Sequence, residues 1–227
     1  STYLKGIDPF QHIRTTSISH RDLEGLNSVK NLDINQKHIY NATHSVPGNI
    51  ESYSKKFGKP YIIGEVGYEW DWSKNFDDFA DGMNMDFRRG LWYGLFCPTP
   101  VTPMSWWWEW FDEHGMIPYI RNARLISDMM LEAGDGRFEF LDTHKDGKAE
   151  TYTVKCGNKT FVYVYNGNST PLESAKIELG KTGKVKVSKL DTENAKLAKA
   201  VKVTADGTIT LSTLGIAPLE DAVFVIE

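Results

Sequence analysis

The sequence predicts an α/β domain over residues 1–135, followed by an all-β domain over residues 136–227. Three observations support this prediction. Apolar strand-like runs alternate with helical stretches in the first part, short strands separated by turn residues fill the second, and all seven Trp residues lie between Trp70 and Trp110. The boundary is expected at residues 133–136, where glycines follow a helical stretch and indicate a helix end and a turn.

The first domain is expected to contain a parallel sheet covered by helices. Its strand-like runs are HIRTTSIS, LDINQKHIY, KPYIIGEVGY and PVTPMSWWW, and helical stretches cover residues 79–96 and 118–132. Strands that alternate with helices indicate parallel pairing. Because neither a GxGxxG nor a GxxxxGK[ST] motif is present, a dinucleotide-binding or P-loop fold is not favoured, and part of a TIM (β/α)8 barrel becomes the leading candidate.

The second domain is expected to be a β-sandwich, because about eight short alternating runs follow one another at sandwich spacing. Turn signals separate the runs at residues 145–148, 157–158, 166–167, 181–183 and 205–207. A packing or spacer role is the ordinary interpretation of this domain. A glycan-binding face is the alternative.

Composition argues against several classes of protein. The formal net charge of -4 and the pI near 5.9 disfavour a nucleic-acid-binding or membrane-surface protein. No apolar run approaches the roughly 20 residues of a membrane helix. Cys97 and Cys156 are too few for a disulfide framework and are expected to be two separate thiols. The six His residues show neither HxH nor HExxH spacing, so neither a metal nor another cofactor is expected.

Glu65 is the first candidate for a chemical role. It follows the apolar residues 61–63 and stands between Gly64 and Gly67, at the carboxyl end of an expected strand. In a barrel this end of the strand builds the active site, and neighbouring glycines let other groups approach closely. A carboxylate that closes an apolar strand is costly unless it is paired or binds something. The alternative is a structural Glu paired with an Arg.

His38 and Tyr40 close the preceding strand. Strand alternation places the two side chains on the same face, where both can donate hydrogen bonds to a carboxylate. We therefore expect them to hold Glu65 ionised and oriented. Either side chain alone would ordinarily be a core residue whose polar atoms are satisfied by the backbone.

A run of three Trp residues suggests a sugar-binding surface. In an extended chain Trp106 and Trp108 would share one face and Trp107 would take the other. Indole rings stack on the apolar C–H faces of sugars and keep an N–H donor. Trp70 and Trp72, just beyond Glu65, could extend this platform. The alternative is that these rings pack under helices or cap the barrel.

These motifs, in this order, resemble the clan A retaining glycoside hydrolases near family 5, the cellulase- and mannanase-type barrels. His38-x-Tyr40 resembles the family's His-x-Tyr at the end of strand six. Residues 63–67 resemble the strand-seven segment that carries the nucleophile, and residues 106–108 resemble the strand-eight Trp region. The segment DPFQHIRTTS resembles strand five of bacterial members, and the second domain resembles the C-terminal β-domain of many of them.

The resemblance implies that residues 1–135 form the C-terminal half of a (β/α)8 barrel, strands five to eight. It also implies that Glu65 is the nucleophile, that His38 and Tyr40 orient it, and that Trp106, Trp108 and Trp70 bind substrate. Retaining enzymes use a second carboxyl group as acid/base, which in this family follows an Asn at the end of strand four. No Asn-Glu dipeptide precedes His38. Glu109, after the Trp run, is expected to be a solvated rim acid.

The expected partners are therefore a β-linked poly- or oligosaccharide and the N-terminal half of the barrel, from the same parent chain or a second chain. Ser1, which is not preceded by Met, is expected to be a cut or processed end, and the chain alone is expected to be incomplete for catalysis. Neither a nucleic acid nor a membrane is an expected partner. Analogy with the family suggests a secreted or periplasmic bacterial enzyme. The competing hypothesis is a non-catalytic glycan-binding or scaffold module that uses the Trp cluster.

Overall fold

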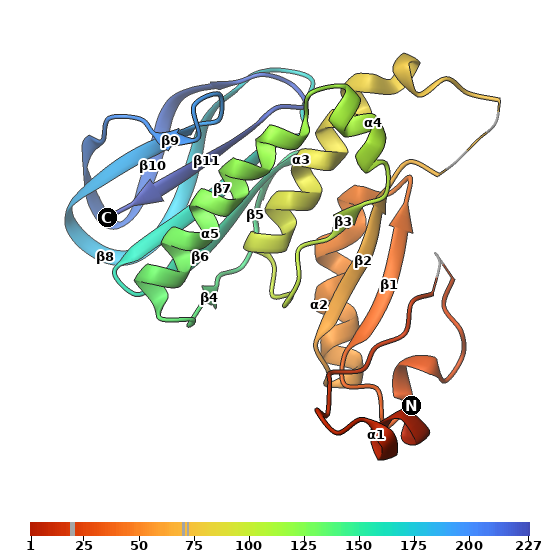
Figure 1. Ribbon diagram of the computed structural model, residues 1–227. Helices are drawn as coiled ribbons and strands as arrows, with labels where there is room; N and C mark the ends of the chain where they lie inside the picture. Colours follow the sequence, from red (N-terminus) through yellow and green to blue (C-terminus); the bar gives the residue numbers. More distant parts are fainter. Residues whose placement is uncertain (19–20, 70, 72) are drawn as a thin grey trace. The chain divides into compact units, whose positions relative to one another are not determined.

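The computed structural model describes residues 1–18, 21–69, 71 and 73–227, and Figure 1 shows its helices and strands. The chain divides into two compact units, Ser1–Ile117 and Pro118–Glu227. Both Cys97 and Cys156 are buried free thiols, as the sequence predicts. No helix in the described ranges is long and apolar enough to span a bilayer.

Unit 1 contains three parallel strands and the helices around them. Its elements are α1 (Thr2–Ile7), η1 (Leu26–Ser28), β1 (Asn35–Tyr40), η2 (Thr43–Ser45), α2 (Val46–Phe57), β2 (Tyr61–Gly67), η3 (Phe76–Phe79), α3 (Ala80–Phe96), β3 (Met104–Ser105) and α4 (Trp108–Glu113). The strand order is β1-β2-β3, with both pairings parallel. The expected parallel sheet is therefore present in the part of unit 1 that the structure describes.

Helices α2 and α3 pack on β2 (Figure 1). The ring of Tyr61 lies 4.7 Å from that of Tyr53 on α2. On α3, the position that a Cβ of Gly90 would occupy is 3.1 Å from a methyl group of Val66. Helix α2 ends where Gly58 takes the left-handed conformation and donates its N–H to the Ser54 carbonyl. The helix is thereby stopped just before Pro60 and the next strand.

Two strands expected in unit 1 are not as the sequence predicts. Residues 12–18 form no strand, and this stretch is fixed instead by Arg14, whose guanidinium pairs with Asp33 at 2.9 Å. The run at residues 100–108 contributes only the two residues of β3. Alternation of apolar and β-branched residues predicts an extended chain, but it cannot tell whether a neighbouring strand is available for pairing.

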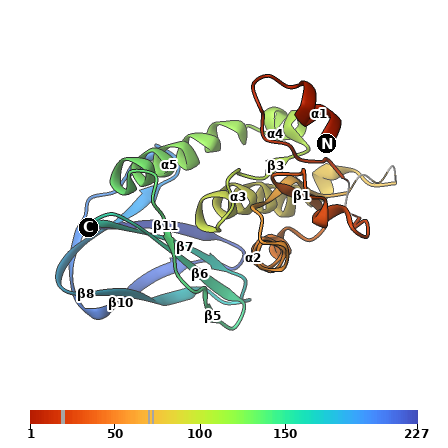
Figure 2. The same ribbon diagram turned by 90° about the horizontal axis from the view of Figure 1, so that it is seen from below.

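Unit 2 consists of one helix and an extensive antiparallel sheet. After η4 (Ile117–Tyr119), its elements are α5 (Ile120–Gly134), β4 (Glu139–Phe140), β5 (His144–Asp146), β6 (Ala149–Cys156), β7 (Lys159–Asn166), β8 (Leu172–Asp191), β9 (Lys196–Leu197), β10 (Val201–Ile216) and β11 (Asp221–Ile226). The main sheet has the order β10-β8-β11-β7-β6-β4. Figure 2 shows α5, the β6–β7–β11 strands and the β8–β10 pair as successive layers of this unit.

The turns expected at residues 181–183 and 205–207 are not turns. Both segments lie inside the long strands β8 and β10, where Gly183 pairs with Ala205 and the register shifts beside Gly207. Gly180, Gly183 and Gly207 have positive φ angles of 65°, 115° and 68°. Such glycines mark bulges as well as turns, so they bend a continuous strand pair here. Apolar side chains of β6, β7, β8, β10 and β11 share one core.

Helix α5 belongs to unit 2, although the sequence places it at the end of the first domain. Its last turn is tightly packed on the β6–β7 turn. A Cβ at Gly134 would lie 3.2 Å from the Cβ of Cys156, and one at Gly157 would lie 2.0 Å from the Ala133 carbonyl oxygen. Asn122 also donates its side-chain N–H to the Thr192 carbonyl at 3.0 Å. The compact unit therefore begins at Pro118 and not at residue 136.

Candidate active site at the carboxyl end of β2

A β-bulge determines which way Glu65 points. In the pairing of β1 with β2, Lys37 lies opposite Ile63, but the next residue, His38, lies opposite Glu65, so Gly64 is an extra residue. Tyr61 and Ile63 are fully buried, and Tyr61 faces α2. Simple alternation from these two residues would place residue 65 on the same, helix-covered face. The bulge moves Val66 to that face instead and leaves Glu65 on the other.

Two donors from β1 meet the Glu65 carboxylate. The phenol of Tyr40 donates a hydrogen bond to Oε2 of Glu65. Nδ1 of His38 lies 3.0 Å from the same oxygen, and the side chains of His38 and Glu65 are 7% and 17% exposed. The alternation that places His38 and Tyr40 on one face of β1 thus brings both of them to Glu65. Neither of these contacts uses Oε1.

The other ring nitrogen of His38 is also in contact. Its Nε2 lies 3.2 Å from Nε2 of Gln36 and 3.3 Å from Oγ of Ser17. Neither residue was expected from the sequence. Gln36 could have been found, because residues 36, 38 and 40 share one face of β1 by the same alternation. Ser17 lies in the non-strand segment before η1, and no local pattern indicates that this segment reaches His38.

The surroundings of Glu65 affect the acidity of Tyr40. Burial raises the pKa of the Tyr40 phenol, and the hydrogen bond to Glu65 raises it further, because ionised Tyr40 would place a second negative charge beside the carboxylate. Tyr40 therefore remains a hydrogen-bond donor over the whole neutral range. In the described residues the Glu65 carboxylate makes its contacts with Tyr40 and His38, and neither of them is Lys or Arg.

The Trp run does not alternate as an extended strand would. The backbone N–H of Trp106 still donates to the Val66 carbonyl at 3.2 Å, but Trp108 is already the first residue of α4. Trp106 and Trp108 are 45% and 57% exposed, so their rings are accessible in this unit. The strand prediction for these residues is wrong, because β3 ends at Ser105. Trp70 and Trp72 lie outside the described residues.

Trp107 has a more confined position than its two neighbours. Its indole N–H donates to the Tyr68 carbonyl at 2.7 Å, and its ring meets Phe76 edge-on at 4.7 Å. A Cβ at Gly67 would lie 3.3 Å from Cδ1 of this ring. The indole therefore packs directly against the end of β2, two residues beyond Glu65, and fixes the backbone there.

Three other acids of unit 1, Glu109, Asp71 and Asp86, make no hydrogen bond or ion pair with Glu65 among the described residues. Glu109 is exposed in the first turn of α4. The pKa of Asp71 is lowered to about 2 by the Ser73 hydroxyl, the Ser73 backbone N–H and Lys74, which suits a permanent anion and not an acid that must deliver a proton. Burial raises the pKa of Asp86, but Asp86 belongs to α3, which packs on the opposite, Val66 face of β2. The contacts of Glu65 seen in the described part of the chain therefore lack a second carboxylate.

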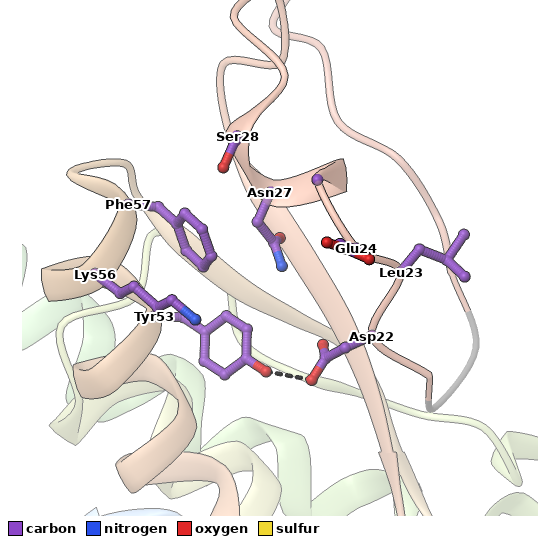
Figure 3. A pocket seen from close by; sticks show the side chains of 9 residues that line it. Asp22, Leu23, Glu24, Asn27, Ser28, Tyr53, Lys56 and Phe57 are labelled. Carbon is purple, nitrogen blue, oxygen red and sulfur yellow. Dashed lines mark hydrogen bonds between the residues drawn. The ribbon is translucent and has the colours of Figure 1, made fainter.

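A separate pocket lies beside α2 (Figure 3). It is lined by Asp22, Leu23, Glu24, Gly25, Asn27, Ser28, Tyr53, Lys56 and Phe57. Tyr53 donates a hydrogen bond to Asp22, and Lys37 lies 3.3 Å from the same carboxylate. Burial and that hydrogen bond raise the pKa of Tyr53 to about 12. Because Tyr53 packs on the helix face of β2, this pocket is not the site of Glu65.

Several solved structures of glycoside hydrolases have a fold similar to that of this chain. A solved structure described as a glycoside hydrolase superimposes with a TM-score of 0.70 at 14% identity, covering 99% of this chain and 59% of that one. A family 5 glycoside hydrolase from Bacteroides vulgatus gives 0.69 at 14% identity, covering 99% and 57%. A family 30 endoxylanase from Clostridium papyrosolvens gives 0.59 at 14% identity, covering 99% and 58%.

These similarities establish the fold. The chain spans a little under three fifths of the length of each of these structures. No protein-family model matches the sequence, and no curated protein matches it. The resemblance to family 5 found in the sequence is thus supported in its coarser form, as structural similarity to family 5 and family 30 glycoside hydrolases.

Proposed function

We propose that this chain is part of a retaining β-glycoside hydrolase in which Glu65 is the nucleophile. The observation that carries the proposal is the carboxylate at the end of β2, held on one oxygen by Tyr40 and His38 and aimed away from the helices. In this proposal unit 1 supplies the last strands of a (β/α)8 barrel, and unit 2 is an accessory β-sandwich. A barrel needs about 250 residues, so unit 1 would supply only part of one.

The chemistry follows from the geometry of the carboxylate. Oε1 of Glu65 attacks the anomeric carbon while an acid/base carboxyl group protonates the departing glycosidic oxygen, which gives a covalent glycosyl-enzyme. Water, deprotonated by the same group, then releases the sugar with retention. The two carboxyl groups must lie about 5–5.5 Å apart. The acid/base would come from the N-terminal half of the barrel, supplied by the same parent chain or by a second chain.

The substrate class that fits is a β-linked poly- or oligosaccharide. Trp106 and Trp108 offer accessible indole faces for stacking on sugar rings. The endoxylanase among the similar structures is consistent with such a polymer. Enzymes that degrade polysaccharides act where the polymer is, so we also propose a secreted or periplasmic location.

The test of the nucleophile uses the protein together with the complementary barrel half. In Glu65→Gln we expect kcat to fall by about 10³-fold or more, because the amide cannot form the glycosyl-enzyme. Glu109→Gln is the matched control and should retain most of the activity. An unchanged kcat in Glu65→Gln would refute the proposal. The chain without its complement should show no turnover.

A chemical label separates catalysis from mere binding. A 2-deoxy-2-fluoro glycoside with a good leaving group should trap the glycosyl-enzyme, and mass spectrometry of the digested protein should place the label on the peptide that contains Glu65. If this chain is instead a glycan-binding module, saccharide will bind but no covalent label will appear. Such a result would favour the binding function through the Trp cluster.

A further inference from the structure

We infer that Gln36 is a positioning residue that fixes His38 as the neutral tautomer with its proton on Nδ1. His38 then presents an N–H to Glu65 and not a second positive charge. The tautomer follows from contacts within unit 1, whereas its use in catalysis rests on the proposed function.

With Nε2 of the Gln36 amide facing the His38 ring, the hydrogen-bond inventory of these side chains leaves one arrangement of protons. The side-chain nitrogen of Gln36 can only donate, so the ring nitrogen facing it at 3.2 Å, Nε2 of His38, must carry a lone pair. The carboxylate of Glu65 can only accept, so Nδ1, at 3.0 Å from it, must carry the proton. A ring with a proton on Nδ1 alone is neutral.

The remaining neighbour is compatible with this arrangement. The Ser17 hydroxyl, 3.3 Å from Nε2, can rotate to donate to the same lone pair. Among the described residues, Glu65 contacts this ring directly, Tyr40 donates to Glu65, and the charge of Glu69 acts on Tyr40. A proton on Nε2 of His38 would place its N–H against the N–H of Gln36.

Gly64 provides the space for this contact. A Cβ at residue 64 would lie 2.5 Å from Nε2 of Gln36, 2.9 Å from its Cδ and 3.1 Å from Nε2 of His38. The bulged residue must therefore lack a side chain for the Gln36 amide to reach His38. The backbone φ angle of Gly64 is not positive, so the requirement comes from this close approach and not from backbone strain.

Nitrogen NMR of the whole chain labelled with ¹⁵N-histidine tests the inference directly. Long-range ¹H–¹⁵N correlations distinguish the Nδ1–H tautomer, the Nε2–H tautomer and the imidazolium, and His38→Asn identifies the signals of His38. We expect the Nδ1–H tautomer at pH 7 in the unaltered protein. Observation of either other form there would overturn the inference.

Two variants remove the contact in different ways. Gln36→Glu turns the donor into an acceptor of the same size, and it should convert His38 to the imidazolium at pH 7. Gly64→Ala should displace the Gln36 amide without a change of charge and give a mixture of tautomers. Gln11→Glu makes the same change of charge on an exposed side chain and should leave His38 unchanged. A His38 signal that is the same in all three variants would refute the role of Gln36.

The functional consequence is measured separately, with the complementary barrel half present. In Gln36→Glu we expect kcat to fall by about 10- to 100-fold with a smaller effect on KM, the range typical of residues that orient a reactive ligand. If the tautomer is confirmed but Glu65→Gln leaves turnover unchanged, the proposed function is refuted. The inference that His38 carries its proton on Nδ1 still holds in that case. If Gln36→Glu changes the tautomer without changing kcat, the catalytic use of the tautomer fails.

Discussion

Glu65 shows what a sequence can and cannot reveal about a single residue. Glycines on both sides and an apolar run before it identify the carboxylate, and alternation along β1 identifies the face shared by His38 and Tyr40. Gln36 lies on the same face, yet an amide has no reactivity of its own that would single it out. Ser17 could not have been found, because its contact with His38 depends on the path of a non-strand segment.

The hydrogen bond from Tyr40 to Glu65 predicts that the stability of the folded protein changes at alkaline pH. The pKa of Tyr40 is raised by burial and by its hydrogen bond to Glu65, so folded Tyr40 keeps its proton above pH 10 while the unfolded chain releases it. The unfolded state then binds fewer protons than the folded state, and the free energy of unfolding falls as the pH rises. Below about pH 10 this contribution is fully present.

Tyr40→Phe should therefore reduce the loss of unfolding free energy that occurs as the pH rises above about 10. Urea unfolding measured by Trp fluorescence reports on unit 1, because all seven Trp residues lie between Trp70 and Trp110. We expect a smaller loss of stability between pH 9 and pH 11 in Tyr40→Phe than in the unaltered chain. Tyr3→Phe is the control, since Tyr3 is 75% exposed and makes no comparable buried contact with a carboxylate. Equal slopes for the unaltered protein and Tyr40→Phe would contradict the prediction.

At the scale of the element, the success of the predictions depends on length and periodicity. The helical stretches at residues 79–96 and 118–132 correspond to α3 and α5, because long amphipathic patterns bounded by turn residues have few alternatives. The short apolar run before α4 and the glycines of β8 and β10 differ from the prediction, because the run forms only the two residues of β3 and the glycines lie inside strands. A glycine with a positive φ angle serves a turn or a bulge equally well, and only the pairing partner decides between them.

The end of β2 offers a test at this scale. Gly67 has a φ angle of 146° and faces the Trp107 indole, so Gly67→Ala adds backbone strain and a tight contact. We expect unit 1 to lose about 1–3 kcal/mol of unfolding free energy. The measurement is urea unfolding followed by Trp fluorescence.

Gly48→Ala provides the matched control for this substitution. Gly48 lies inside α2, and no neighbouring atom lies within 4 Å of the position that an added methyl group would take. The same chemical change should therefore be neutral there or stabilise by up to about 1 kcal/mol. A loss of stability in Gly48→Ala as large as that in Gly67→Ala would show that the conformation of Gly67 is not the cause.

At the scale of the whole molecule, the change in composition lies at a different place from the division between the two compact units. The change from Trp-rich to Lys-rich sequence follows α5, whereas the packing of Gly134 and Gly157 assigns α5 to the second unit. Amino-acid composition reflects the surface and chemistry of a segment. Which sheet a helix covers is decided by contacts between residues far apart in the sequence.

Fragments test this boundary. Residues 118–227 expressed alone should unfold in one cooperative transition, measured by circular dichroism because the fragment contains no Trp. Residues 136–227 lack α5, which buries Ile126 and Met130, and should be less stable by about 3 kcal/mol or more. Equal stability of the two fragments would place the boundary at residue 135 after all.

The bulge at Gly64 determines on which face of β2 the Glu65 carboxylate lies. If Gly64 were paired regularly with β1 and not bulged, Glu65 would lie in the apolar layer beneath α2 and Val66 would turn outward. Deletion of Gly64, by contrast, would place Glu65 directly after Ile63 and leave both Glu65 and Val66 on their present faces. The same residues in a strand without the bulge could therefore bury or present the carboxylate, depending only on whether position 64 is occupied.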